Sequence, residues 1–136
     1  MISLDEIWSW YETARDSLRI IRALWETQPD LIPPSVTMGT VFETQPRSEV
    51  LRRLQQAERE LDDLTIVALW ASIESLYKKI PRTTKEEQQI QDIKDYRDWI
   101  AHGRRLGRGK ERPPPPVTPD VAYARLKKAL ESIQER

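Results

Sequence analysis

The sequence predicts an all-α protein, an antiparallel up-and-down bundle of about four main helices. Apolar residues recur at helical spacing over four long segments, and no segment gives a convincing strand. Prolines cluster between these segments, at 29–46 and 113–119, where they end or begin helices. With 136 residues, 22 basic and 22 acidic, the chain fits a single highly charged, soluble domain spanning 1–136.

The first helix is expected at about Leu4 to Glu26. Ser3 and Glu6 fit a capping box, which would satisfy free N–H groups at its start. A long connector with several prolines follows at about 28–46, and it either packs over the bundle or is mobile. The apolar residues that predict this helix by their spacing are Ile7, Tyr11, Leu18, Ile21 and Trp25.

The second helix is expected at about Ser48 to Ile80, where Pro81 ends it. Its early half is charged and is expected to project or to meet a partner, whereas its later half is apolar and is expected to be buried. The third helix is predicted at about Lys85 to Ala101, with Gly103 as its stop. A second long connector, at about 103–117, leads to the fourth helix.

The fourth helix is expected to start with Thr118 as its cap and Pro119 at its first position.

The composition limits the chemistry of the whole chain. The absence of cysteine excludes a disulfide, a thiolate zinc site and a cysteine nucleophile, and a single histidine makes a zinc site unusual. We therefore expect no metal and no cofactor. No segment approaches the roughly 20 apolar residues that span a bilayer, so a cytoplasmic protein without membrane contact is expected.

The third helix carries the candidate site. On a helical wheel Arg97 falls within the apolar stripe of Ile90, Ile93 and Ile100. A guanidinium there is costly unless it is paired or faces a cleft. His102, the only histidine, lies about 140° round the helix from Arg97. Asp98 lies four residues before His102, so the two side chains can contact each other. The Asp98 carboxylate could orient the imidazole and favour its charged form.

Structural explanations of the same residues stand beside the functional one. A histidine at a helix C-terminus is favoured by the macrodipole without any function. Asp98 and His102 can form an ordinary exposed pair, which contributes little stability. Arg97 can pair with a structural carboxylate such as Glu74.

The segment Arg97-Asp98-Trp99-Ile100-Ala101-His102 resembles the signature of the HEPN superfamily. That signature is an arginine, usually followed by Asn, Asp or His, and then a histidine after four to six intervening residues. The resemblance covers the third helix closely and the whole chain only by its helical architecture. It implies a HEPN-like fold and a metal-independent endoribonuclease that acts as a homodimer, with the arginine and histidine of both subunits facing one cleft.

Carried over to this chain, the resemblance implies that Arg97 and His102 are catalytic and that Asp98 supports them. Glu74 loosely resembles an acidic residue that some members carry on the preceding helix. RNA supplies its own nucleophile, the 2′-hydroxyl, so an imidazole for proton transfer and a guanidinium for phosphate charge suit its cleavage. The products would carry 2′,3′-cyclic phosphate ends. The implied setting is a toxin–antitoxin or defence system, with an antitoxin or regulatory protein as a possible partner.

One position departs from a subfamily of HEPN toxins, in which a partner nucleotidyltransferase modifies a tyrosine two residues after the histidine. Arg104 stands there in this chain, which puts that route of inhibition in doubt. It opens a basic segment that either binds the RNA backbone or forms a solvated linker. The residues of this segment assigned to RNA binding are Arg104, Arg105, Arg108 and Lys110.

Two other functions stay open at this point. The chain can be a non-catalytic HEPN-like helical module that binds a nucleotide or a partner protein such as a nucleotidyltransferase. Arg97 would then be a phosphate ligand or part of a structural ion pair. The chain can also be a plain dimerisation protein in which the match to the signature is accidental.

Overall fold

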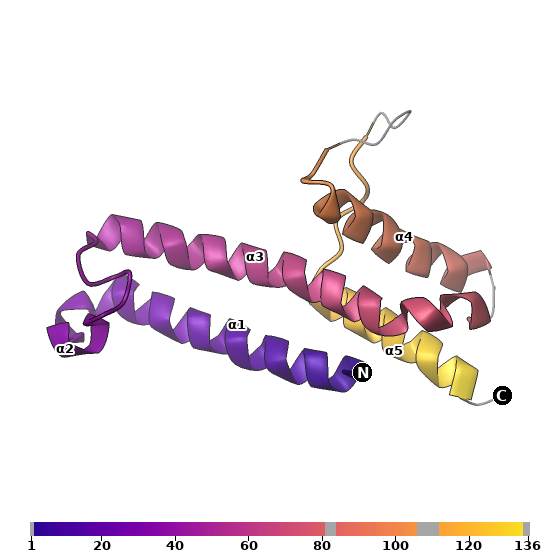
Figure 1. Ribbon diagram of the computed structural model, residues 1–136, viewed down its shortest axis with the longest axis horizontal. Helices are drawn as coiled ribbons and strands as arrows, with labels where there is room; N and C mark the ends of the chain where they lie inside the picture. The colour runs from indigo at the N-terminus through magenta and orange to yellow at the C-terminus, as the bar shows by residue number, and fades with distance from the viewer. Residues whose placement is uncertain (1, 81–83, 106–111, 135–136) are drawn as a thin grey trace. The chain divides into compact units, whose positions relative to one another are not determined.

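The computed structural model describes residues 2–80, 84–105 and 112–134, and this part of the chain is helical, without strands (Figure 1). The all-α prediction is confirmed for these residues. Four long helices account for most of them, with one short helix and two 3₁₀ segments between them. The elements are α1 (Leu4–Thr27), η1 (Pro29–Leu31), α2 (Pro34–Thr37), α3 (Arg47–Ile73), η2 (Glu74–Lys79), α4 (Thr84–Ala101) and α5 (Pro119–Gln134).

Two helix starts are fixed by the caps that the sequence predicts. At α1 the backbone N–H of Ser3 donates to Glu6 Oε2 at 3.0 Å, and the N–H of Glu6 donates back to Ser3 Oγ at 3.2 Å. This is the reciprocal pairing of a capping box. At α5, Pro119 takes the first helical position and the N–H of Val121 donates to Thr118 Oγ1 at 3.4 Å. Both predicted N-termini are therefore confirmed.

The end of the second predicted helix differs from the expectation. A helix was expected to continue to Ile80, but α3 ends at Ile73 and the chain continues as η2. Helices often tighten into 3₁₀ geometry in their last turns, because i→i+3 bonds satisfy carbonyls that have no α-helical partner. Ile80 then takes an extended conformation, with ψ of 128°, as the following Pro81 requires.

The helices gather into two compact units, one formed by Met1–Trp10 with Asp62–Arg136 and the other by Tyr11–Leu61. The assignment of 1–136 to a single domain stays a prediction.

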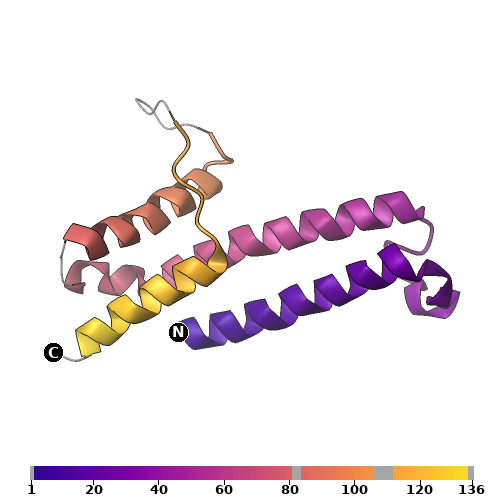
Figure 2. The same ribbon diagram turned by 180° about the vertical axis from the view of Figure 1, so that it is seen from behind.

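The 11–61 unit is a hairpin in which α1 and α3 run antiparallel, as Figures 1 and 2 both show. Arg22 Nε lies 2.7 Å from Glu58 Oε2, which joins the two helices by an ion pair. Arg47 closes the far end of the hairpin, because its Nε donates to the carbonyl of Trp25 at 2.9 Å and its Nη2 donates to the carbonyl of Glu26. The buried apolar side chains of this unit are Tyr11, Val50, Leu54 and Leu61.

The 28–46 connector covers little of the hairpin. Leu31, Val36 and Val41 are all more than half exposed, so most of its apolar side chains lie in solvent. Ile21, one of the apolar residues at helical spacing that predicted α1, is also 40% exposed. A two-helix hairpin has only one internal face, and this face cannot accommodate every apolar side chain of both helices.

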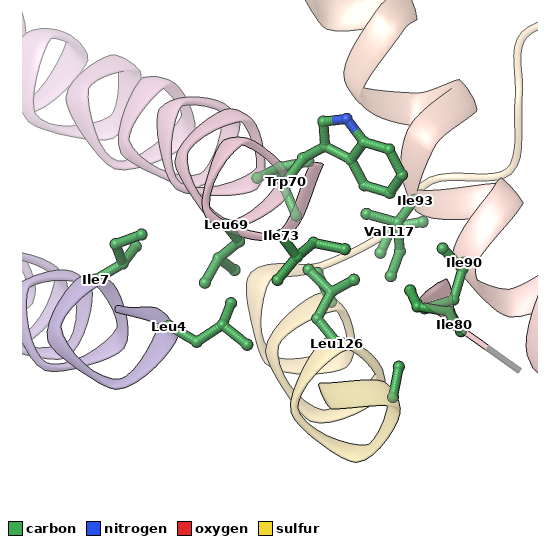
Figure 3. Packing of buried hydrophobic residues seen from close by; sticks show 13 residues of the cluster. Leu4, Ile7, Leu69, Trp70, Ile73, Ile80, Ile90, Ile93, Val117 and Leu126 are labelled. Atoms are coloured by element: carbon green, nitrogen blue, oxygen red, sulfur yellow. The ribbon is translucent and has the colours of Figure 1, made fainter. Parts of the chain in front are cut away.

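The other unit holds the main core, where α4, α5, the end of α3 and the start of α1 meet (Figure 3). Leu69, Ile93 and Leu126, one from each of three helices, are completely buried. Trp70 is 1% exposed and packs edge-to-face on Tyr77 at a centroid distance of 5.3 Å. The later half of the second predicted helix is therefore buried as expected. Further core residues drawn in Figure 3 are Leu4, Ile7, Ile73, Ile80, Ile90 and Val117.

Replacing Leu126 tests whether this core holds the unit together. Leu126→Ala is expected to lower the free energy of unfolding by about 2–5 kcal/mol, because it leaves a cavity among completely buried neighbours. Leu64→Ala is the matched control, since Leu64 lies on α3 with 62% of its surface exposed, and it should cost less than about 1 kcal/mol. Urea unfolding followed by circular dichroism measures both. Equal losses would contradict the described core.

Candidate functional site

Helix α4 ends in a turn that places its last residues firmly. The N–H of Gly103 donates to the carbonyl of Ile100 at 3.0 Å, and the N–H of Arg104 donates to the carbonyl of Trp99 at 2.8 Å. These two bonds form a Schellman motif, whose stop residue takes a left-handed conformation. Gly103 does so, with φ of 70°. The prediction that Gly103 ends this helix is confirmed, and His102 is the capping residue between helix and turn.

The His102 side chain is exposed, and among the described residues it makes no hydrogen bond or ion pair. The backbone N–H of His102 donates to the carbonyl of Asp98 at 3.0 Å. The main chain at His102 is therefore fixed by a helical hydrogen bond, although the imidazole itself is not. Carbonyls without helical partners surround a helix C-terminus and favour a positive charge there. The imidazole is therefore placed to exchange protons with solvent or with a bound molecule.

Arg97 lies at the edge of the apolar stripe and not within the core. Ile90 and Ile93 are buried, whereas 28% of the Arg97 side chain is exposed. Its Nη1 donates to Asp98 Oδ1 at 2.6 Å, while its buried Nε has no acceptor among the described residues. Glu74, the weaker candidate partner, is exposed at the start of η2, and it makes no hydrogen bond or ion pair with Arg97.

Asp98 pairs with cations on its own helix. Besides Arg97, Lys94 Nζ lies 3.4 Å from Asp98 Oδ2. Partial burial raises the pKa of the Asp98 carboxyl, but the hydrogen bond from Arg97 and the charge of Lys94 outweigh it, so the pKa lies below its ordinary value. Asp98 is thus a carboxylate at neutral pH. The expected contact between this carboxylate and the His102 imidazole is not observed among the described residues.

Arg104 is engaged within the protein. Its Nη2 donates to Asp63 Oδ2 at 2.5 Å, and its guanidinium lies over the ring of Trp99, 4.8 Å from the centroid. The pKa of the Arg104 guanidinium lies above its ordinary value. The main cause is a hydrogen bond with the Tyr96 side chain, and the hydrogen bond with Asp63 is the next largest cause. Sequence reasoning did not find Asp63 or Tyr96. The spacing of Tyr96 and Trp99 by three residues on one helix was the available signal for an aromatic pair.

The other basic residues assigned to RNA binding divide into two groups. Arg105 is exposed and has no ion pair among the described residues. Arg108 and Lys110, also assigned to RNA binding, lie outside the described residues. Binding of RNA by any of the basic residues stays a prediction, and Arg104 would have to bind phosphate while keeping or exchanging its contact with Asp63.

Within 2–80, 84–105 and 112–134 no three His, Asp or Glu side chains gather as a metal site would require. None of the helices in this part of the chain is both long and apolar enough to cross a membrane. No family model, curated protein or solved structure matches the chain. The HEPN resemblance therefore rests on the segment from Arg97 to His102 and on the helical architecture.

The pairing of Asp98 predicts a pH-dependent contribution to stability. A carboxyl group whose pKa is lowered by folding stabilises the fold above its ordinary value of 3.8, and this contribution is lost as the pH falls through the lowered value. Asp98→Asn should destabilise the protein at pH 7 by less than about 1 kcal/mol, because solvent screens a pair that is one-third exposed.

Urea unfolding of both proteins between pH 7 and pH 3 measures this effect. The two free energies of unfolding should converge as the pH falls below 3.8. A difference that stays constant over the whole range would show that Asp98 acts through packing and not through its charge.

Proposed function

We propose that the protein is a metal-independent endoribonuclease of HEPN type, active as a homodimer. The observation that carries this proposal is the position of the chain's single imidazole. His102 is exposed at the ordered end of α4, without a side-chain partner among the described residues, five positions after Arg97, whose side chain is partly buried. Imidazole is the side chain best suited to move protons at physiological pH.

The chemistry divides between the two side chains. His102 would take the proton of the 2′-hydroxyl or give one to the departing 5′-oxygen, which general acid–base catalysis requires. Arg97 would bind the phosphate oxygens and stabilise the charge that grows on them during attack. The bond to the 5′-oxygen breaks as the 2′-oxygen bonds to phosphorus, which leaves a 2′,3′-cyclic phosphate and a 5′-hydroxyl.

Two arguments favour a site built from two subunits. One chain has one histidine, whereas the reaction uses one proton acceptor and one proton donor, and a twofold dimer supplies both. In addition, the side chains of Arg97 and His102 point about 140° apart on an ideal helix, so the two residues of one chain do not face the same phosphate. No hydrogen bond joins the two side chains within the described part of the chain.

Single-stranded RNA is the proposed substrate class, held by exposed arginines after the helix. Arg105 is exposed and has no ion pair within the part of the chain that the structure describes, and Arg108 and Lys110 add charge in the sequence. Asp98 would support Arg97, with its carboxylate fixed by Lys94 and ready to orient the guanidinium. A free ribonuclease harms its host, so a cytoplasmic toxin–antitoxin or defence role with an inhibitory protein partner completes the proposal.

A second function is favoured by one specific observation. Arg97 Nη1 already donates to Asp98 at 2.6 Å, as a structural ion pair would. If Arg97 serves only to form this ion pair, the chain is a non-catalytic helical module that binds a nucleotide or a partner protein such as a nucleotidyltransferase. His102 would then be a surface residue favoured by the helix dipole.

Cleavage of a labelled single-stranded RNA in EDTA tests the first function against the second. Wild type is expected to cut and to leave 2′,3′-cyclic phosphate ends, while His102→Ala and Arg97→Ala should each lose at least about 100-fold in rate. A DNA of the same sequence should resist cutting because it lacks the 2′-hydroxyl.

Arg53→Ala is the matched control, since this arginine on α3 is 44% exposed and belongs to the other unit, and it should cut like wild type. Circular dichroism establishes that each variant is folded. Equal cutting by wild type and His102→Ala would point to a contaminating nuclease. No cutting by folded wild type would favour the binding module instead.

A further inference from the structure

The residue directly after the helix stop has an unusual backbone. Arg104 has φ of 60°, the only positive φ at a non-glycine residue within the described ranges. A residue with a Cβ atom is strained in this left-handed region, because the Cβ atom comes too close to the following carbonyl oxygen. Asparagine and aspartate tolerate it through local hydrogen bonds, but arginine has no such feature. Contacts of the side chain must therefore hold Arg104 in place.

Those contacts come from two helices. Asp63 on α3 accepts a hydrogen bond from Arg104 Nη2 at 2.5 Å, although the two residues lie 41 positions apart in the sequence. Trp99 on α4 lies under the guanidinium at 4.8 Å, and its ring also contacts that of Tyr96 at 5.8 Å. Asp63 is the less exposed partner of the ion pair, at 24% against 43% for Arg104. A charge pair that is also stacked on an aromatic ring fixes a guanidinium better than either contact alone.

The same turn determines where His102 lies. The N–H of Arg104 closes the loop on the carbonyl of Trp99, and His102 is one of the residues inside that loop. Holding Arg104 at both its backbone and its guanidinium therefore fixes the direction in which the chain leaves α4. It also fixes the peptide planes on either side of Gly103, and with them the direction of the His102 Cα–Cβ bond.

We propose that Asp63 acts through Arg104 as a positioning residue that orients His102 at the end of α4. The proposal rests on the proposed ribonuclease for its catalytic consequence, but the orientation itself is a property of the free protein. Asp63 touches no reacting atom and binds no RNA in this role. Its carboxylate accepts a hydrogen bond from the Arg104 guanidinium and fixes it. Fixing Arg104 stabilises the strained turn, and the turn determines the orientation of the imidazole.

Because His102 is the only histidine, its imidazole gives a single, unambiguous set of NMR signals. Asp63→Asn removes the charge and keeps the shape of the side chain. It should raise the exchange rate of the Arg104 amide hydrogen about 10-fold, because the turn opens more often, and should shift the His102 imidazole signals. Glu49→Gln is the matched control, since it removes a partly exposed carboxylate paired with Arg52 in the other unit, and it should change neither.

A double-mutant cycle with Arg104→Gly shows whether Asp63 acts through Arg104. Glycine adopts a φ of 60° without strain, so the turn is retained while the tie to α3 is lost. In the Arg104→Gly background, Asp63→Asn should have no further effect on the His102 signals. An effect of the same size in both backgrounds would overturn the proposal, and so would unchanged amide exchange and imidazole signals in Asp63→Asn alone.

Catalysis provides the last readout. In RNA cleavage Asp63→Asn should lower kcat about 10-fold and leave KM unchanged, as expected when a reacting group is misplaced but substrate binding is intact. A rise in KM at constant kcat would overturn the proposal, because it would assign Asp63 to binding. If wild type cuts no RNA, the proposed ribonuclease fails, and the NMR experiments still decide whether Asp63 orients His102.

Discussion

The burial of one face of α4 is the constraint on which the candidate site depends. Ile93 is completely buried, in a core with Leu69 and Leu126. In a helix the direction of every side chain follows once one of them is fixed, because successive residues are related by about 100°. With Ile90 and Ile93 in the core, Arg97 can only emerge at its edge, where half-buried guanidinium groups find partners. Dispersion and hydrophobic burial thus set the geometry of a polar site.

The second constraint is the way in which α4 stops. A helix that merely frayed would leave its last side chains mobile, whereas the Schellman turn at Gly103 keeps the backbone ordered up to Arg104. The positive φ of Arg104 costs free energy, and the ion pair with Asp63 and the stacking on Trp99 offset it. The exposed His102 side chain therefore stands on an ordered main chain, the arrangement a proton-transferring group needs.

Much of the fold follows from local features of the sequence. The apolar spacing, the Ser3 capping box, Pro119 and Gly103 predicted where α1, α4 and α5 begin or end, because these signals act within a turn or two of the chain. The change to 3₁₀ geometry at Glu74 was missed, since a following proline indicates that a helix ends but not how its last turn is wound.

The candidate site was less predictable than the helices. Its residue types and their spacing along α4 are visible in the sequence, but their partners are not. Asp98 has cations within reach on either side, and only the structure distinguishes Lys94 and Arg97 from His102 as its partners. The pair of Asp63 and Arg104 joins positions 41 residues apart, and no periodicity relates them. Charges on different helices meet through tertiary packing, which a single sequence does not encode locally.

We propose that two subunits together form one ribonuclease site around His102. The most direct test of this proposal is the activity of wild-type protein mixed with increasing proportions of His102→Ala protein, refolded together at constant total concentration so that the subunits exchange. If both histidines of a dimer take part, activity falls as the square of the wild-type fraction, because mixed dimers are inactive. Activity that falls in direct proportion to the wild-type fraction would show that each chain cuts alone, and would contradict the shared site.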